Sequence, residues 1–230
     1  SNALSTLEFE GIETFTKKLF GISYAYHPQN FIIKNQLSIK LNYLTGTRNI
    51  LSTKSNQSKG LAIVNYLWNL NNKHQISIKN TTEFLNSTKL LENELFQIGG
   101  INSIKGFDDQ SILTSKYNVT NVAYKFYTNT TNYLYTISDL GFIKNQINNT
   151  SNTLIGLGIG YNFKSKNSII NISYATGKSK NQSFKANNAK VHISISYNFS
   201  FFNSYLKWEI IYSYIIVSII ESSKPNNFFV

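Results

Sequence analysis

The chain has 230 residues, enough for one domain with a sizeable core or for about half of a large β-barrel. It contains no cysteine, which excludes disulfides, thiolate metal sites and cysteine nucleophiles. Charged residues make up only 14% of the chain, against roughly 25% in ordinary soluble domains, and the net charge of +11 comes from scattered lysines. This scatter gives no concentrated basic face, so the expected partners do not include nucleic acid.

Residues 1–3, Ser-Asn-Ala, have the composition of a cloning remnant and are left out of the fold prediction. After them, segments with strand-like composition follow one another at short intervals. Most approach the ~9–11 residues that a tilted strand needs to cross a bilayer. Short links alternate with longer polar ones, as in a barrel with one rim on each side of a membrane. The longer links include 45–59 and 144–152. The predicted strands span residues 14–26, 32–44, 61–70, 74–85, 117–127, 133–142, 154–163, 169–175 and 191–199.

The last of these segments shows the clearest alternation. Its polar face carries Ser and Asn, and its apolar face carries Val191, Ile193, Ile195, Tyr197 and Phe199. Period-2 alternation of this kind predicts a strand that is apolar on one side and polar on the other. Segment 154–163 repeats the pattern with three glycines on one face, Gly156, Gly158 and Gly160. Because glycines leave a smooth surface, we expect another backbone to approach that face closely.

The fold class that these strands predict is all-β, an antiparallel transmembrane β-barrel. A soluble β-sandwich also has one polar face on each sheet, so alternation alone does not separate the two folds. Three features favour the barrel: strand faces that end in Tyr and Phe, long strands connected in series, and the scarcity of helical periodicity and helix caps. The soluble β-sandwich stays open as the alternative fold.

A glycine-rich loop at 86–116 interrupts the strands. Gly99 and Gly100, a short spacer, and a basic residue followed by Gly106 and Phe107 combine backbone freedom with a single charge at the tip. On a polar-lined barrel, this pattern indicates a tethered plug or lock rather than an enzyme site. The segment 99–107 resembles the inward-folded loop of the Omp85 superfamily, which holds outer-membrane assembly factors and two-partner secretion transporters.

Further motifs of that superfamily follow in the same order. The stretch 138–141, Ser-Asp-Leu-Gly, resembles the strand motif that faces the loop, and 191–199 resembles the last strand with its terminal aromatic signal. The resemblance implies that residues 4–199 are about the last nine strands of a sixteen-stranded barrel. It also implies a loop-lock pair, Lys105 with Asp139, and a glycine groove that faces the loop, namely Gly141, Gly156, Gly158 and Gly160.

Phe107 is expected to pack on the inner wall beside the glycine-rich strand, with Gly106 and Gly160 permitting the contact. Two features depart from the superfamily pattern. The usual Arg of the motif is Lys105 here, and Lys offers a point charge in place of a bidentate fork. The chain also continues past Phe199 with an atypical tail, 200–230, for which we expect no place in the barrel.

The remaining acidic and imidazole side chains predict no chemical site. Asp108 and Asp109 have no nearby histidine or third carboxylate, so they are expected to be solvated at the loop tip rather than to bind a metal. His27, His74 and His192 lie on separate segments without ligand spacing. The sequence contains no P-loop and no dinucleotide fingerprint.

The resemblance implies a protein of the outer membrane of a Gram-negative bacterium that assembles or translocates other proteins, without enzymatic activity, cofactor or metal. The expected partners are outer-membrane lipid, client β-barrel or secreted β-rich proteins, and accessory lipoproteins. Clients are expected to bind at the barrel seam near 191–199 by adding a strand. A passive structural barrel or porin is the first alternative, and a soluble β-sandwich binding module is the second.

Overall fold

The computed structural model describes residues 15–27, 35–50, 53–165, 167–197 and 214–215. Residues 1–3, Phe199 and the tail 200–230, apart from 214–215, lie outside the described residues, so the expectations for them stay predictions. Within the described part, no helix is long and apolar enough to cross a lipid bilayer.

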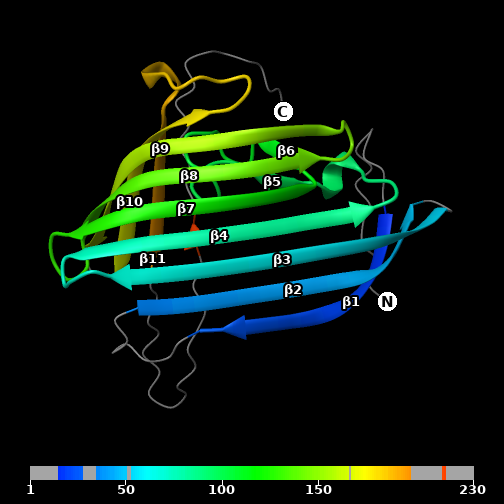
Figure 1. Ribbon diagram of the computed structural model, residues 1–230, viewed down its shortest axis with the longest axis horizontal. Helices are drawn as coiled ribbons and strands as arrows, with labels where there is room; N and C mark the ends of the chain where they lie inside the picture. Colours follow the sequence, from blue (N-terminus) through cyan, green and yellow to red (C-terminus); the bar gives the residue numbers. More distant parts are fainter. Residues whose placement is uncertain (1–14, 28–34, 51–52, 166, 198–213, 216–230) are drawn as a thin grey trace.

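The described residues form one large antiparallel sheet and one small one (Figure 1). The nine long strands of the large sheet are β1 (Phe15–Tyr26), β2 (Asn35–Ile50), β3 (Thr53–Asn69), β4 (His74–Ser87), β7 (Lys116–Tyr127), β8 (Tyr133–Asn145), β9 (Thr150–Ser165), β10 (Ser168–Lys178) and β11 (Lys190–Tyr197). A two-residue strand, β12 (Tyr214–Ile215), pairs with β11. The small sheet pairs β5 (Phe96–Ile98) with β6 (Ile112–Thr114), and the connections hold the 3₁₀ turns η1 (Glu92–Glu94) and η2 (Ala186–Asn188).

The large sheet is strongly curved (Figure 1). Its described strands pair in the order β1-β2-β3-β4-β7-β8-β9-β10-β11-β12, so β1 and β12 are its two ends. A curved run of antiparallel strands in series is a portion of a barrel wall. The prediction of an all-β fold with about nine barrel strands is therefore confirmed.

Several strands run further than the sequence predicted. The link expected at 45–59 is wrong, because β2 continues to Ile50 and β3 begins at Thr53. The link expected at 144–152 likewise shrinks to residues 146–149. These extensions are rich in Thr, Ser, Asn and Lys, a composition typical of loops, but their backbone groups are paired in the sheet and thus need no other partners.

One face of the large sheet, which we call the outer face, exposes apolar side chains from all nine long strands. Ile22 is 78% exposed, Phe20 72% and Ile159 66%. Alternate residues point to the opposite, inner face, which is dominated by polar side chains and glycines. A continuous apolar surface of this extent suits lipid rather than water.

Aromatic side chains on the outer face gather in two bands. The first lies near the strand ends at the rim that holds the short turns 70–73 and 128–132, and it contains Tyr24, Tyr26, Trp68, Tyr124, Phe126 and Tyr197. The second lies towards the other rim, which we call the loop rim because residues 88–115 and 179–189 connect strands there, and it contains Phe20, Tyr43, Phe142 and Tyr174. Paired aromatic girdles are typical of membrane barrels.

The buried apolar core lies between the 88–115 connection and the inner face of the large sheet. It consists of Ile98, Ile104, Phe107, Val119 and Leu154. On the outer face, Val191 of β11 is 52% exposed instead of being covered by a second sheet. The soluble β-sandwich alternative is therefore wrong, because a sandwich would bury that row of side chains.

Candidate functional site

The connection between β4 and β7 folds back as a hairpin against the inner face. Its stem is β5 paired with β6, and its tip comprises residues 99–111. Gly99, Gly100 and Gly106 have φ angles of 116°, 80° and 86°, in the left-handed region that favours glycine. The Gly99 N–H donates to Ser103 Oγ at 2.7 Å, and the Ser103 hydroxyl donates to the Gly99 carbonyl at 3.0 Å. The tip is thus a tight turn that is held partly by its own hydrogen bonds.

The structure places Lys105 of this tip beside Asp139 of β8. The backbone N–H of Lys105 donates to Asp139 Oδ2 at 2.9 Å, and Lys105 Nζ lies 4.0 Å from the same oxygen. The Asp139 side chain is only 2% exposed. The carboxylate therefore meets the loop chiefly through a charge-assisted hydrogen bond from the backbone, and the ammonium adds a longer ionic contact.

The two residues after Lys105 reach β10 and β11. The Gly106 N–H donates to His192 Nε2 at 3.3 Å, and any Cβ on Gly106 would collide with the backbone of Thr176 and Gly177. Phe107 is 5% exposed, and its ring lies so close to Gly177 that a Cβ there would collide with it. Backbone-to-backbone approach of this kind requires glycine at both positions.

Two of the glycines predicted to face the loop lie beneath its tip. Gly141 lies against Ile104, and Gly156 lies against the Lys105 carbonyl so closely that a Cβ would collide with it. The tip therefore packs on a part of the inner face that lacks side chains, directly beside Asp139.

The other two predicted glycines have different neighbours. Gly158 adjoins the backbone of β10, and Gly160 lies beneath the ring of Tyr135. Tyr135 is held in place because its hydroxyl donates to Asn171 Oδ1 at 2.8 Å. The expected contact between Gly160 and Phe107 is wrong, because Tyr135 already occupies the space and Phe107 packs on Gly177 instead.

The tip makes further contacts that the sequence did not single out. Asn121 Nδ2 of β7 donates to the Ser103 carbonyl at 2.8 Å. Lys190 Nζ of β11 lies 2.7 Å from Asp108 Oδ1, so this carboxylate, whose side chain is 46% exposed, forms an ion pair that the sequence did not predict. Strand alternation places Asn121 and His192 on the inner face, but which tip atom each one meets depends on the conformation of the loop.

The predicted terminal-strand signal lies on the outer face of β11. Val191, Ile195 and Tyr197 are exposed to 52%, 42% and 41%, and Ile193 lies on the same side. β11 is paired with β10 along the whole length of β11, whereas β12 pairs only with Ile195 and Ser196. Within the described residues, most of the second edge of β11 therefore has no strand beside it.

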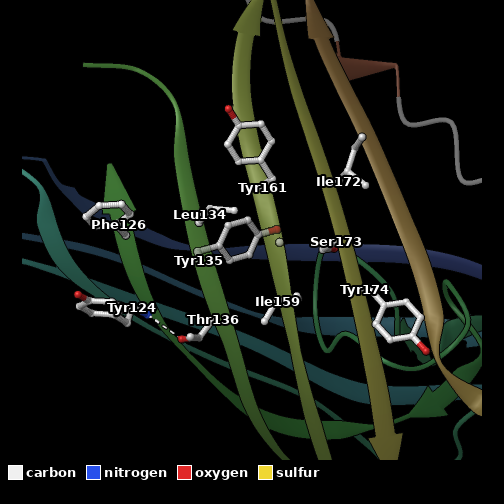
Figure 2. Close-up of a pocket in the computed structure, with 11 residues that line it drawn as sticks. Tyr124, Phe126, Leu134, Tyr135, Thr136, Ile159, Tyr161, Ile172, Ser173 and Tyr174 are labelled. Atoms are coloured by element: carbon white, nitrogen blue, oxygen red, sulfur yellow. Dashed lines mark hydrogen bonds between the residues drawn. The ribbon is translucent and has the colours of Figure 1, made fainter. Parts of the chain in front are cut away.

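Figure 2 shows an apolar hollow of about 520 Å³ on the outer face over β7–β10. Aromatic and aliphatic side chains form its sides. No charged residue lines it, so a hydrocarbon chain fits it better than a polar ligand does. The lining residues are Tyr124, Phe126, Leu134, Tyr135, Thr136, Ile159, Gly160, Tyr161, Ile172, Ser173 and Tyr174.

Comparison with known proteins links these features to one family. The family model of the haemolysin secretion/activation proteins ShlB/FhaC/HecB matches residues 4–163, which include the loop, Asp139 and Gly156. No curated protein matches the chain. Members of this family are outer-membrane secretion transporters of the Omp85 superfamily in Gram-negative bacteria, rather than enzymes. The chain therefore belongs to the haemolysin secretion/activation protein family ShlB/FhaC/HecB.

Proposed function

We propose that this chain is part of the barrel of a two-partner secretion transporter, which passes a secreted β-rich protein across the outer membrane. We favour translocation of a secreted protein over assembly of other barrels, because the matching family consists of haemolysin secretion/activation proteins. The single observation that carries the proposal is the loop tip bound on the inner face at Asp139. A loop held there lies in the path of any polypeptide that crosses the barrel.

The role proposed for Lys105 and Asp139 is that of a reversible lock. A carboxylate that is 2% exposed requires hydrogen-bond donors, and the tip supplies one from its backbone. Once the tip leaves, water in the lumen can solvate Asp139 in its place. The lock therefore stabilises the docked loop without making release prohibitively costly, because the lost hydrogen bond is exchanged for one with water.

Outer-membrane lipid is proposed as the partner of the outer face. The two aromatic bands border the exposed apolar surface, and the strands turn polar beyond the second band, as at Thr47 and Asn49 of β2. The hollow in Figure 2 would hold an acyl chain, because its lining is aromatic and aliphatic.

The secreted client is proposed to bind at the second edge of β11. Among the described residues, β12 pairs with that edge at Ile195 and Ser196, and residues 190–194 have no second strand beside them, so the backbone groups on that side can pair with an incoming strand. Strand addition would supply main-chain hydrogen bonds that do not depend on the sequence of the client.

Secretion by bacterial cells tests the proposal. Cells that carry the protein in the outer membrane and also express a β-rich exoprotein should release that exoprotein into the medium. Asp139→Ala should reduce the released fraction, whereas Glu92→Ala, which removes an exposed carboxylate of η1, should leave it unchanged. Ion conductance without any secretion would instead support the passive porin.

A further inference from the structure

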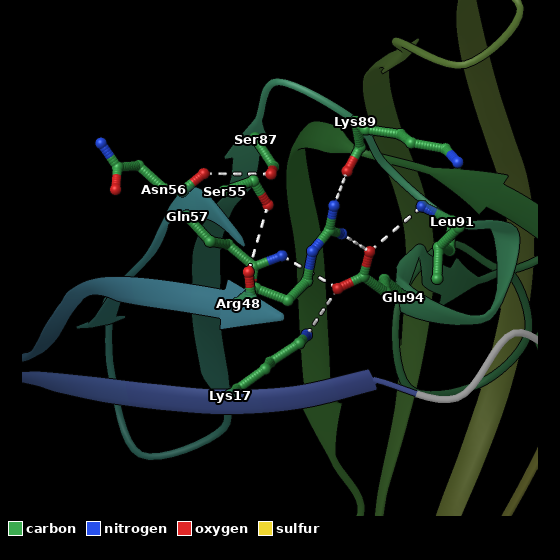
Figure 3. A network of polar contacts seen from close by, with 9 residues as sticks. All are labelled: Lys17, Arg48, Ser55, Asn56, Gln57, Ser87, Lys89, Leu91 and Glu94. Atoms are coloured by element: carbon green, nitrogen blue, oxygen red, sulfur yellow. Dashed lines mark hydrogen bonds and ion pairs between the residues drawn. The ribbon is translucent and has the colours of Figure 1, made fainter. Parts of the chain in front are cut away.

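The outward limb of the loop hairpin, residues 88–95, is bound to the sheet at a second place (Figure 3). There the Glu94 carboxylate contacts the Arg48 guanidinium of β2 through Oε2. Gln57 Nε2 of β3 donates to Glu94 Oε1 at 2.9 Å, and Lys17 Nζ of β1 lies 2.9 Å from the same oxygen. A second guanidinium nitrogen of Arg48 donates to the Lys89 carbonyl. One limb of the loop is thus connected to three consecutive strands.

This contact uses a residue that is scarce in the chain. Arg48 is the only arginine among 230 residues, and its side chain and that of Glu94 are both 0% exposed. A buried guanidinium requires acceptors in a planar fork, and Glu94 and the Lys89 carbonyl supply them on two of its nitrogens. Lysine cannot donate in two directions with that geometry. The specific choice of arginine therefore points to a site where the loop must be held in one orientation.

The surroundings of Glu94 favour the charged form of its carboxyl group. Burial alone would raise the pKa of Glu94, but hydrogen bonds from Gln57, Lys17 and the Leu91 backbone N–H lower it more, so the net pKa lies below its ordinary value. The Leu91 N–H donates to Glu94 Oε2 at 3.1 Å, which also fixes the start of η1.

The position of this contact differs from that of the lock. Arg48 and Gln57 lie on the extensions of β2 and β3 past the second aromatic band, at the loop rim. The tip, in contrast, is bound to β8 through Asp139, and to β10 and β11 through Gly177 and His192. The loop therefore connects the β1–β3 side of the sheet with the β8–β11 side.

We propose that Arg48 and Glu94 form a rim clasp, a positioning pair that fixes the outward limb of the loop and thereby holds the tip over Asp139. Because only ten residues lie between Glu94 and Lys105, the position of Glu94 limits where the tip can reach. The expected effect of the clasp on secretion rests on the proposed function. Its effect on loop position is independent of what the barrel transports.

Hydrogen exchange read out by mass spectrometry tests the clasp in the membrane-reconstituted protein. Arg48→Met should speed exchange in 88–95 by about tenfold or more, the factor expected for loss of a charged hydrogen bond, and should also speed exchange in 99–107. Arg48→Lys keeps the charge and should give a smaller increase in both segments. Lys54→Met, which removes an exposed charge from β3, is the matched control and should change neither segment.

The pattern of exchange separates positioning from a general loss of stability. Positioning predicts faster exchange in 88–95 and 99–107 with β8 and β9 unchanged. Equal rates for Arg48→Met and Lys54→Met, or faster exchange in 88–95 without any change in 99–107, would overturn the proposal. Normal secretion by a variant with a released tip would refute the role of the lock in secretion and leave the clasp itself intact.

Discussion

Replacement of Asp139 by alanine should release the loop tip. The substitution removes the acceptor for the Lys105 backbone N–H at 2.9 Å and for Lys105 Nζ at 4.0 Å. A hydrogen bond to a charged acceptor contributes about 1.5–3 kcal/mol, and a partly exposed ion pair contributes at most about 1 kcal/mol. Together these contributions are about 1.5–4 kcal/mol, so the undocked fraction should rise roughly 10- to 900-fold.

Lysine replacement should have a much smaller effect. Lys105→Ala removes only the 4.0 Å contact of Nζ, because the backbone N–H that binds Asp139 remains. The undocked fraction should rise by no more than about fivefold, the factor for at most about 1 kcal/mol. The ordering of the two variants follows from the finding that the backbone, rather than the ammonium, makes the shorter contact.

Thiol modification measures these fractions directly. The chain has no cysteine, so a single Ile104→Cys reports only on the tip, and Ile104 is 0% exposed when docked. The rate of reaction with a water-soluble reagent is proportional to the undocked fraction. All variants carry the same Ile104→Cys background, so its own effect cancels in the ratios. Equal rates in Asp139→Ala and the parent, or a larger increase in Lys105→Ala than in Asp139→Ala, would refute the reasoning.

Three further predictions concern the same contacts. Lys105→Arg should slow thiol modification at position 104, because a guanidinium can add a forked contact to Asp139. Gly177→Ala should weaken docking by about 1–3 kcal/mol through collision with the Phe107 ring, seen as faster modification at position 104. Acid should release the outward limb. The folded pKa of Glu94 is lowered from 4.5, so its stabilising contribution is complete above pH 4.5 and is lost as pH falls through the lowered pKa. Exchange protection of 88–95, corrected for the intrinsic pH dependence of exchange, should fall in that window in the native protein but not in Glu94→Gln.

Local periodicity predicted most of the fold. The alternation in 191–199 follows directly from the two faces of a strand, and β11 occupies 190–197 with Val191 on the outer face. The polar segment 45–59 misled the prediction, because its composition suits a loop, whereas past the second aromatic band the strands stay paired with polar residues on both faces. Composition alone does not distinguish the two.

Contacts distant in sequence set the limit of prediction for the site. Glycine spacing and a single charge indicated the tip, the resemblance to the Omp85 superfamily implied its partner strand, and the structure places Lys105 beside Asp139. Gly106 and His192 are 86 residues apart in the sequence, and Arg48 and Glu94 are 46 apart. No local sequence pattern predicts either contact. The presence of one arginine in a lysine-rich chain was the only available signal for the rim clasp.

Zero-length carbodiimide cross-linking of the native protein tests the central claim, that the tip is docked on the inner wall. Lys190 Nζ and Asp108 Oδ1 are 2.7 Å apart and their side chains are 30% and 46% exposed, so they are accessible to the reagent. Mass spectrometry should find an amide between the peptides that contain Lys190 and Asp108 in the folded protein and none after denaturation. A folded protein in which Asp108 is never joined to Lys190 would contradict the docked position of the loop.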